Sequence, residues 1–263
     1  MKRLATLLLV AVCALGATTA IALAETLVGT SGDDTLEGSS SPDQLYGEDG
    51  NDDLTGLGGN DYLEGGPGDD QVDTGADDDL AIGGTGADKI TAGAGTDVVY
   101  AGVGADEVLG EGGRDVLLGQ AGDDRIFGGA GDDSIYTGVG TDFADGGLGR
   151  DLVAADSEVG ETSTLNGGTE NDKLLGNGPG NFVVDGGSGD DRIVTGPGTD
   201  RVTGGGGKDR IATAAGDDDI DAVDDRRDLV RCGPGRDTVR ADKRDRLRGC
   251  ESVTRAAPRR HAR

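Results

Sequence analysis

Aspartate recurs at every ninth position from Asp34 to Asp151 without one shift of register. This spacing defines fourteen consecutive nonapeptide repeats over residues 29–154. A fixed short period is typical of a repeat architecture, in which each unit packs mainly against its neighbours. Only 34% of the 263 residues are hydrophobic and tryptophan is absent, which argues against a single thick core. The sequence therefore predicts a thin solenoid in which each repeat buries one or two side chains.

Four positions of each nonapeptide are constrained. Glycine stands at the first or second position of all fourteen repeats and at the fourth position of twelve. Aspartate always fills the sixth position, and a large aliphatic residue fills the eighth in twelve repeats. Glycine allows tight bends, and a single inward aliphatic side chain between outward neighbours is typical of a very short strand. Each repeat therefore predicts a bend, a short strand and a carboxylate at the bend, and such hard oxygen ligands suit Ca²⁺.

The complete pattern is seen in residues 65–73 and again in residues 128–136. It resembles the repeats-in-toxin, or haemolysin-type, calcium-binding repeat. The resemblance implies an all-β, right-handed parallel β-roll solenoid in which two nonapeptides make one turn. It also implies several Ca²⁺ ions, each held between a loop and the loop one turn later on the same edge. One ion for each adjacent pair of loops gives about a dozen sites in this block.

The resemblance assigns calcium ligation to the aspartates at the sixth position of the repeats. One edge of the roll would carry Asp34, Asp52, Asp70, Asp88, Asp106, Asp124 and Asp142. The other edge would carry Asp43, Asp61, Asp79, Asp97, Asp115, Asp133 and Asp151. A second block of repeats over residues 186–221 adds Asp191, Asp200, Asp209 and Asp218.

The repeat register breaks after Val153. Asp151 and Asp172 are 21 residues apart, and residues 155–166 lack the glycine bends. Phe182 stands at the sixth position of the repeat that starts at Asn177, so we expect that calcium site to be lost. Residues 155–185 are then either a bulge on one continuous roll or a joint between two rolls. The tolerance of solenoids for insertions on one face favours the bulge.

The N-terminus has the three parts of a secretory signal peptide, predicted over residues 1–24. A basic start is followed by the apolar run 4–15 and then by Ala22-Leu23-Ala24. An uncleaved membrane anchor is the alternative. No later segment has transmembrane length and polarity, so we expect a secreted, extracellular protein, with cell-surface association left open. Family members exported in one step usually lack such a signal, so a different export route is implied.

The C-terminal region differs from the rest in charge and in cysteine content. Residues 25–225 carry 46 acidic and nine basic side chains, a net charge of −37, whereas residues 226–263 carry five acidic and 13 basic ones. The acidic body is expected to repel nucleic acid and to stay expanded without cations. In an exported chain, Cys232 and Cys250 are expected to form a disulfide, with free thiols as the alternative.

Residues 222–255 are therefore predicted to form a disulfide-stapled basic cap over the last turn, and residues 256–263 a disordered basic tail. The basic residues either offset the charge of the body or bind an anionic partner in the cell envelope.

Nothing in the sequence indicates catalysis. The one histidine is His261, and evenly spaced carboxylates suit ligation better than a tuned acid–base pair. We predict a calcium-binding, exported repeat protein that folds into a β-roll on extracellular calcium and is not an enzyme. The alternative is a structural or adhesive surface protein in which the roll is a spacer and the basic cap binds the partner. A third option, an unfolded calcium-buffering polyanion, does not need an aliphatic residue two positions after each aspartate.

Overall fold

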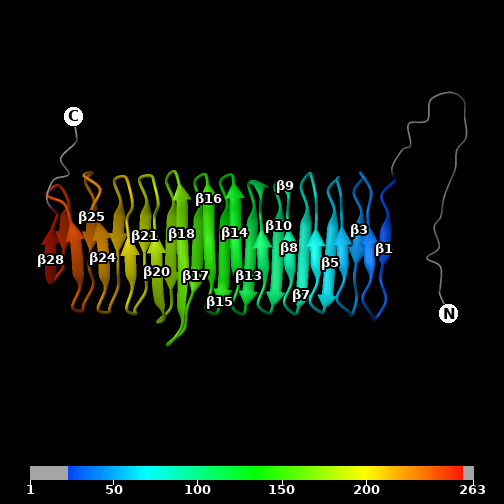
Figure 1. The fold of residues 1–263 in the computed structure, drawn as a ribbon, viewed down its shortest axis with the longest axis horizontal. Coiled ribbons are helices and arrows are strands. Elements are labelled where there is room, and N and C mark those ends of the chain that lie inside the picture. The colour runs from blue at the N-terminus through cyan, green and yellow to red at the C-terminus, as the bar shows by residue number, and fades with distance from the viewer. Residues whose placement is uncertain (1–22, 257–263) are drawn as a thin grey trace, which may run out of the picture.

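The computed structural model describes residues 23–256, and in these residues the chain forms 28 strands and no helix. The strands build two parallel sheets that run the length of a rod, with the first residues at one end and the last at the other (Figure 1). Most of the predicted signal peptide and basic tail lie outside the described residues. The architecture is an all-β parallel solenoid of about 13 turns, as the sequence predicted.

The chain alternates between the two sheets from one nonapeptide to the next. The first sheet contains β1 (Thr26–Val28), β3 (Gln44–Tyr46), β5 (Tyr62–Pro67), β7 (Leu80–Thr85), β10 (Val98–Val103), β13 (Val116–Ala121), β15 (Ser134–Val139), β17 (Leu152–Asp156), β19 (Lys173–Asn177), β21 (Arg192–Val194), β23 (Arg210–Ala212), β25 (Leu229–Arg231) and β27 (Arg246–Arg248). The second sheet contains β2 (Thr35–Glu37), β4 (Asp53–Thr55), β6 (Gln71–Asp73), β8 (Lys89–Thr91), β9 (Ala94–Gly95), β11 (Glu107–Leu109), β12 (Gly112–Gly113), β14 (Arg125–Ala130), β16 (Phe143–Leu148), β18 (Thr162–Thr169), β20 (Asn181–Asp185), β22 (Arg201–Thr203), β24 (Asp219–Ala222), β26 (Thr238–Ala241) and β28 (Ser252–Arg255).

Each strand pairs in parallel with the strand one turn later, so equivalent side chains stack along the rod. Leu45 opposes Leu63 in the first sheet, and Leu54 opposes Val72 in the second. These eighth-position side chains are almost fully buried, whereas their neighbours in the same strand point outward. The core is therefore a thin double file of aliphatic side chains between the two sheets.

The two sheets continue without interruption through residues 155–185. β17 pairs with β15 and β19, and β18 pairs with β16 and β20. One turn lengthens here from 18 to 21 residues, since Val153 opposes Leu174. The additional residues form the loop between β17 and β18, which extends beyond the neighbouring loops in Figure 1. The register break is thus a surface bulge on one continuous solenoid.

The segment predicted as a cap is made of further turns of the same solenoid. β25 pairs with β23 and β27, and β26 pairs with β24 and β28. Val230 and Val239 continue the buried file in these turns. Cys232 and Cys250 form the predicted disulfide, with their Cα atoms 5.2 Å apart.

Loss of this disulfide is expected to destabilise the calcium-loaded protein by about 3 kcal/mol, because the bond closes a loop of about 19 residues in the unfolded chain. The Cys232→Ser/Cys250→Ser variant, unfolded with urea beside the wild type, tests this expectation. A change below about 0.5 kcal/mol would show that the last turns hold together without the disulfide.

The fourth-position glycines are required by the close stacking of loops. Gly131 has a φ of 144°, and a Cβ there would collide with the carbonyl oxygen of Gly113 one turn earlier. We expect Gly131→Ala to lower the free energy of unfolding by about 2 kcal/mol or more. Gly112→Ala is the matched control, because a Cβ there has no atom within 4 Å. Urea unfolding should show a change within about 0.5 kcal/mol for the control, and equal effects would contradict the packing argument.

Candidate metal sites at the loop edges

The sixth-position residues lie in two rows, each at the start of the strands of one sheet. The first-edge row, before the strands of the first sheet, contains Asp43, Asp61, Asp79, Asp97, Asp115, Asp133, Asp151, Asp172, Asp191, Asp209, Asp228 and Asp245. The second-edge row lies at the start of the strands of the second sheet, and its members at β18 and β20 are the second residues of those strands. It contains Asp34, Asp52, Asp70, Asp88, Asp106, Asp124, Asp142, Ser163, Phe182, Asp200, Asp218 and Asp237.

One carboxylate oxygen of each aspartate locks successive turns together. The backbone N–H of Asp70 donates to Asp88 Oδ1 at 2.9 Å, and that of Asp88 donates to Asp106 Oδ1 at 2.8 Å. The first-edge row repeats this bond at every turn from Asp43 to Asp245, with distances between 2.7 and 3.1 Å. Oδ1 therefore has a structural role that is the same along the rod.

The second oxygen, Oδ2, points into a cradle formed by two consecutive loops. A Cβ placed on Gly128 would lie 2.6 Å from Asp133 Oδ2 and 2.6 Å from the Gly146 carbonyl oxygen. Fifteen of the eighteen predicted ligands have a buried Oδ2 with no hydrogen-bond partner among the described residues. Such an atom is costly unless it is paired. A buried anionic oxygen beside a carbonyl oxygen of the next turn is a donor set that fits a hard divalent cation.

Burial also perturbs the acidity of these groups. Loss of solvent raises the pKa of Asp79, Asp88, Asp115 and Asp124 from the ordinary value of 3.8 to about 7, although the backbone amide on each carboxylate opposes the rise. The neighbouring aspartates of the same row add repulsion at each of these four positions. Without a cation, the folded roll therefore holds rows of carboxylates in a place that disfavours their charge.

Comparison with known protein families identifies the cation that these cradles would hold. The profile of the RTX calcium-binding nonapeptide repeat, built of four copies, matches residues 28–63, 46–81, 82–117, 118–153 and 185–220. These matches cover more than half of the chain. The chain belongs to the RTX calcium-binding repeat family. No curated protein sequence matches it. The nonapeptides of this RTX protein are thus calcium-binding repeats for several Ca²⁺ ions.

The RTX sites are not clusters of side chains. Among residues 23–256, nowhere do three or more His, Cys, Asp or Glu side chains gather around one point. Each cradle instead offers one carboxylate per turn and the backbone oxygens of glycine-rich loops. Calcium, when bound there, supplies the positive charge that these oxygens need.

Three predicted ligands differ from the others in that the protein already pairs their Oδ2 atoms. Thr137 Oγ1 donates to Asp142 Oδ2 at 2.6 Å, and the backbone N–H of Ser39 donates to Asp43 Oδ2 at 2.5 Å. Thr30 Oγ1 donates to Asp34 Oδ2 at 2.8 Å. These three carboxylates have less need of a cation than the fifteen others.

The structure adds three aspartates that the sequence did not assign as ligands. Asp172, Asp228 and Asp237 occupy the rows, and each has a buried, unpaired Oδ2. Their Oδ1 atoms accept a backbone N–H from the preceding turn, as in the other aspartates of the rows. The N–H of Asp151, for example, donates to Asp172 Oδ1 at 2.8 Å. The signal was the aliphatic residue two positions later, which is Leu174, Val230 or Val239.

The second-edge row is interrupted at two consecutive turns. Ser163 accepts the N–H of Asp142 through its hydroxyl at 3.2 Å. Phe182 follows in the next turn, fully buried under Gly176, where a Cβ would meet its ring. The RTX roll therefore offers carboxylates at every turn of one edge and lacks them at two turns of the other.

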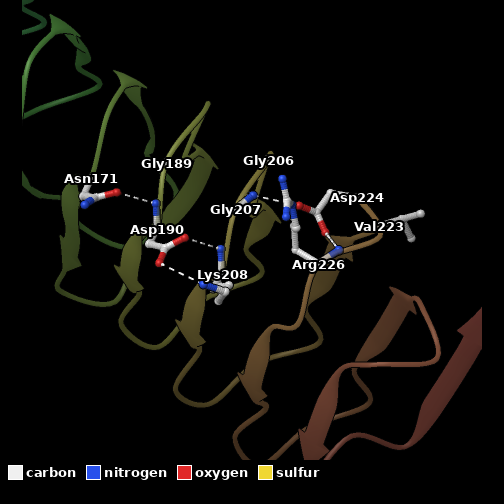
Figure 2. A pocket seen from close by; sticks show the side chains of 10 residues that line it. Asn171, Gly189, Asp190, Gly206, Gly207, Lys208, Val223, Asp224 and Arg226 are labelled. Carbon is white, nitrogen blue, oxygen red and sulfur yellow. Dashed lines mark hydrogen bonds and ion pairs between the residues drawn. The ribbon is translucent and has the colours of Figure 1, made fainter.

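A second, exposed ladder runs along the loops at the fifth position. Asn171 Oδ1 accepts the N–H of Asp190 at 2.6 Å, and Asp190 Oδ1 accepts the N–H of Lys208 at 2.9 Å. Figure 2 shows these residues beside a polar hollow of about 750 Å³ at the first edge, which Asp224 and Arg226 also line. These exposed Asx side chains satisfy backbone amides and do not belong to the cation cradles.

The described part of the chain contains no helix that is long and apolar enough to span a bilayer.

Proposed function

We propose that this RTX protein is an exported, calcium-folded β-roll in which the sixth-position aspartates are the ligands. The observation that carries the proposal is the repeated, buried and unpaired Oδ2 atom facing the carbonyl oxygen of the next turn. The proposed ligands are the fifteen predicted aspartates whose Oδ2 is buried and unpaired, together with Asp172, Asp228 and Asp237, which share that property. Extracellular calcium modules typically bind in the 10⁻⁴–10⁻³ M range, so the chain would fold only after export.

Calcium counting in two adjacent-residue variants tests the ligand assignment. Asp70 is buried in the second-edge row, whereas Asp69 is exposed at the fifth position. We expect Asp70→Asn to lose at least one bound ion in equilibrium dialysis with elemental analysis, because it removes a charged ligand. Asp69→Asn makes the same charge change and should keep the full count. Equal counts in both variants would contradict the assignment.

Export is tested by the N-terminus of the mature protein. The predicted signal peptide ends at Ala24, so protein recovered outside a bacterial host should start at Glu25. Full-length protein retained in the cells would contradict export by this route.

A binding role without catalysis is part of the proposal. The carboxylates repeat with one environment along each row, whereas an acid–base pair needs two different environments. The alternative role, a spacer that presents a partner-binding region, needs a surface for that partner near the C-terminus.

A further inference from the structure

The outer face of the first sheet has a charge pattern opposite to that of the protein. The first and third residues of its strands point outward, and from β1 to β27 these positions hold one carboxylate, Glu64. From β19 onward the same positions hold six cations, in a chain whose net charge is −27. These are Lys173, Arg192, Arg210, Arg231, Arg246 and Arg248.

Strand pairing places five of these six like charges directly opposite one another, while Arg246 opposes Leu229. Lys173 opposes Arg192, and Arg192 opposes Arg210. Adjacent strands are about 4.8 Å apart, and like charges in register destabilise a sheet. None of these six side chains forms an ion pair with another described residue.

The second sheet treats its cations differently. Lys89 pairs with Glu107 across neighbouring strands at 3.2 Å, and Arg240 pairs with Asp221 at 2.6 Å. These cations on the second sheet therefore have partner carboxylates on neighbouring strands, whereas the six cations on the first sheet have none among the described residues. The six unpaired cations on the outer face of the first sheet are therefore able to bind an anion from outside the protein.

Two hollows lie among these cations, and a third shares a lining residue with one of them. One of about 300 Å³ lies among Arg192, Arg210 and Arg231. A second of about 220 Å³ shares Arg210 and adds Lys208, Arg227 and Arg246. Lys208 also lines the hollow of Figure 2, with Arg226 on a neighbouring loop. We call the surface formed by Arg192, Lys208, Arg210, Arg227, Arg231 and Arg246 the basic trough.

No carboxylate among the described residues forms an ion pair with an arginine of the trough. Asp209 and Asp228 are buried in the first-edge row. Asp224 accepts the N–H of Gly207 at 2.7 Å, and Asp190 accepts that of Lys208 at 2.9 Å while its other oxygen lies 3.9 Å from Lys208 Nζ. The five arginines of the trough consequently keep their donors for a ligand, and a guanidinium fork suits sulfate and carboxylate groups.

We propose that the basic trough binds a linear anionic polysaccharide. Cations in register on three successive strands, beside hollows that share lining residues, fit a polymer with repeating charge better than one small anion. Nucleic acid fits less well, because no aromatic residue follows Phe182 in the sequence and single strands bind on aromatic platforms. This inference goes beyond calcium binding but requires the folded roll, so folding is measured separately.

The test compares two quadruple variants of the full mature protein in millimolar calcium. The trough variant is Arg192→Gln/Arg210→Gln/Arg231→Gln/Arg246→Gln. The control, Arg150→Gln/Arg201→Gln/Arg236→Gln/Arg240→Gln, makes the same charge change outside the trough, and two of its sites lie in the basic C-terminal region. Dextran sulfate is the probe, and uncharged dextran of equal length is its control. Circular dichroism of each variant reports folding independently of binding.

The wild type should bind dextran sulfate and not dextran, with affinity that falls as salt rises. The trough variant should lose at least about tenfold in affinity and show a shallower salt dependence, whereas the control variant should stay within about twofold. If the quadruple variant does not fold, the single Arg210→Gln variant, which changes two hollows at once, should still weaken binding by about threefold.

Three results would overturn the proposal. The first is equal binding of dextran sulfate and dextran by the wild type. The second is an equal loss of affinity in both quadruple variants, which would make total charge and not the trough responsible. The third is tighter, trough-dependent binding of oligo(dT) or of phosphatidylglycerol vesicles, which would assign the surface to another class of partner.

Discussion

Calcium added to calcium-free residues 25–263, with the disulfide intact, is expected to convert this chain from an expanded coil to β-structure in one steep transition. Residues 25–225 carry a net charge of −37, and their folded form buries rows of carboxylates. Each turn contacts only its neighbours, so an ion bound between two loops favours the folding of the next turn. The midpoint is expected at about 10⁻⁴–10⁻³ M calcium.

Far-ultraviolet circular dichroism during a calcium titration measures this transition, and magnesium is the control ion. Magnesium is smaller and gives up its water reluctantly, so cradles of backbone oxygens and one carboxylate per turn should not hold it. We expect little β-signal with magnesium at the concentration where calcium is saturating. A β-signal that does not change with calcium, or that rises equally with both ions, would contradict the proposal that calcium folds the chain.

Acid is expected to replace calcium as the folding agent. The pKa values of Asp79, Asp88, Asp115 and Asp124 are raised by burial from 3.8 to about 7 in the folded chain. Between these values the folded state binds more protons than the unfolded state, so stability falls as pH rises. The contribution is fully present below pH 3.8 and is lost as pH rises through about 7. The calcium-free chain should therefore gain β-structure as pH is lowered from 8 to 4.5.

Protonation of exposed carboxylates also reduces repulsion, so a matched pair of variants is needed. Asp88→Asn/Asp106→Asn/Asp124→Asn imitates the protonated form at three buried positions, and its amide oxygen can still accept the backbone N–H. Asp69→Asn/Asp78→Asn/Asp123→Asn makes the same charge change at exposed positions. The buried set should shift the calcium-free folding midpoint to higher pH by more than the exposed set. Equal shifts in the two variants would mean that acid folding depends on net charge alone. Sedimentation of the same samples checks that the β-signal does not come from aggregates.

The sequence was sufficient for the features that depend on period. A nine-residue repeat with one inward aliphatic side chain predicted a solenoid with a thin core, and the resemblance to the RTX repeat implied parallel strands with two repeats per turn, the arrangement in which Leu45 opposes Leu63. The resemblance also implied two rows of aspartates, and the structure has them because alternate repeats enter alternate sheets. The disulfide between Cys232 and Cys250 was predicted because these are the two cysteines that remain after the predicted signal peptide, in a chain expected to be exported.

Features that depend on interrupted register needed the structure. Asp172 joins the first-edge row only because a 21-residue turn brings it under Asp151, and turns of varying length do the same for Asp228. The pairing of Asp142 Oδ2 depends on how Thr137 is oriented, which no repeat period specifies. The arginines of the trough likewise have no fixed spacing in the sequence, and only strand pairing shows that Arg192, Arg210 and Arg246 share one outward row, with Leu229 between the last two.

The interruption at Ser163 and Phe182 also has a mechanical meaning. A rod pulled at both ends loads its turns in series, and it parts where the links between neighbouring turns are fewest. The first-edge row keeps a carboxylate–amide link at each turn, but on the second edge no such link joins Ser163 to the turn of Phe182. The backbone compensates for the missing link, because β18 and β20 pair through five residues, whereas β22 and β24 pair through three. This turn therefore carries tension mainly through its sheets, so bound calcium should add less mechanical strength here than at other turns of the rod.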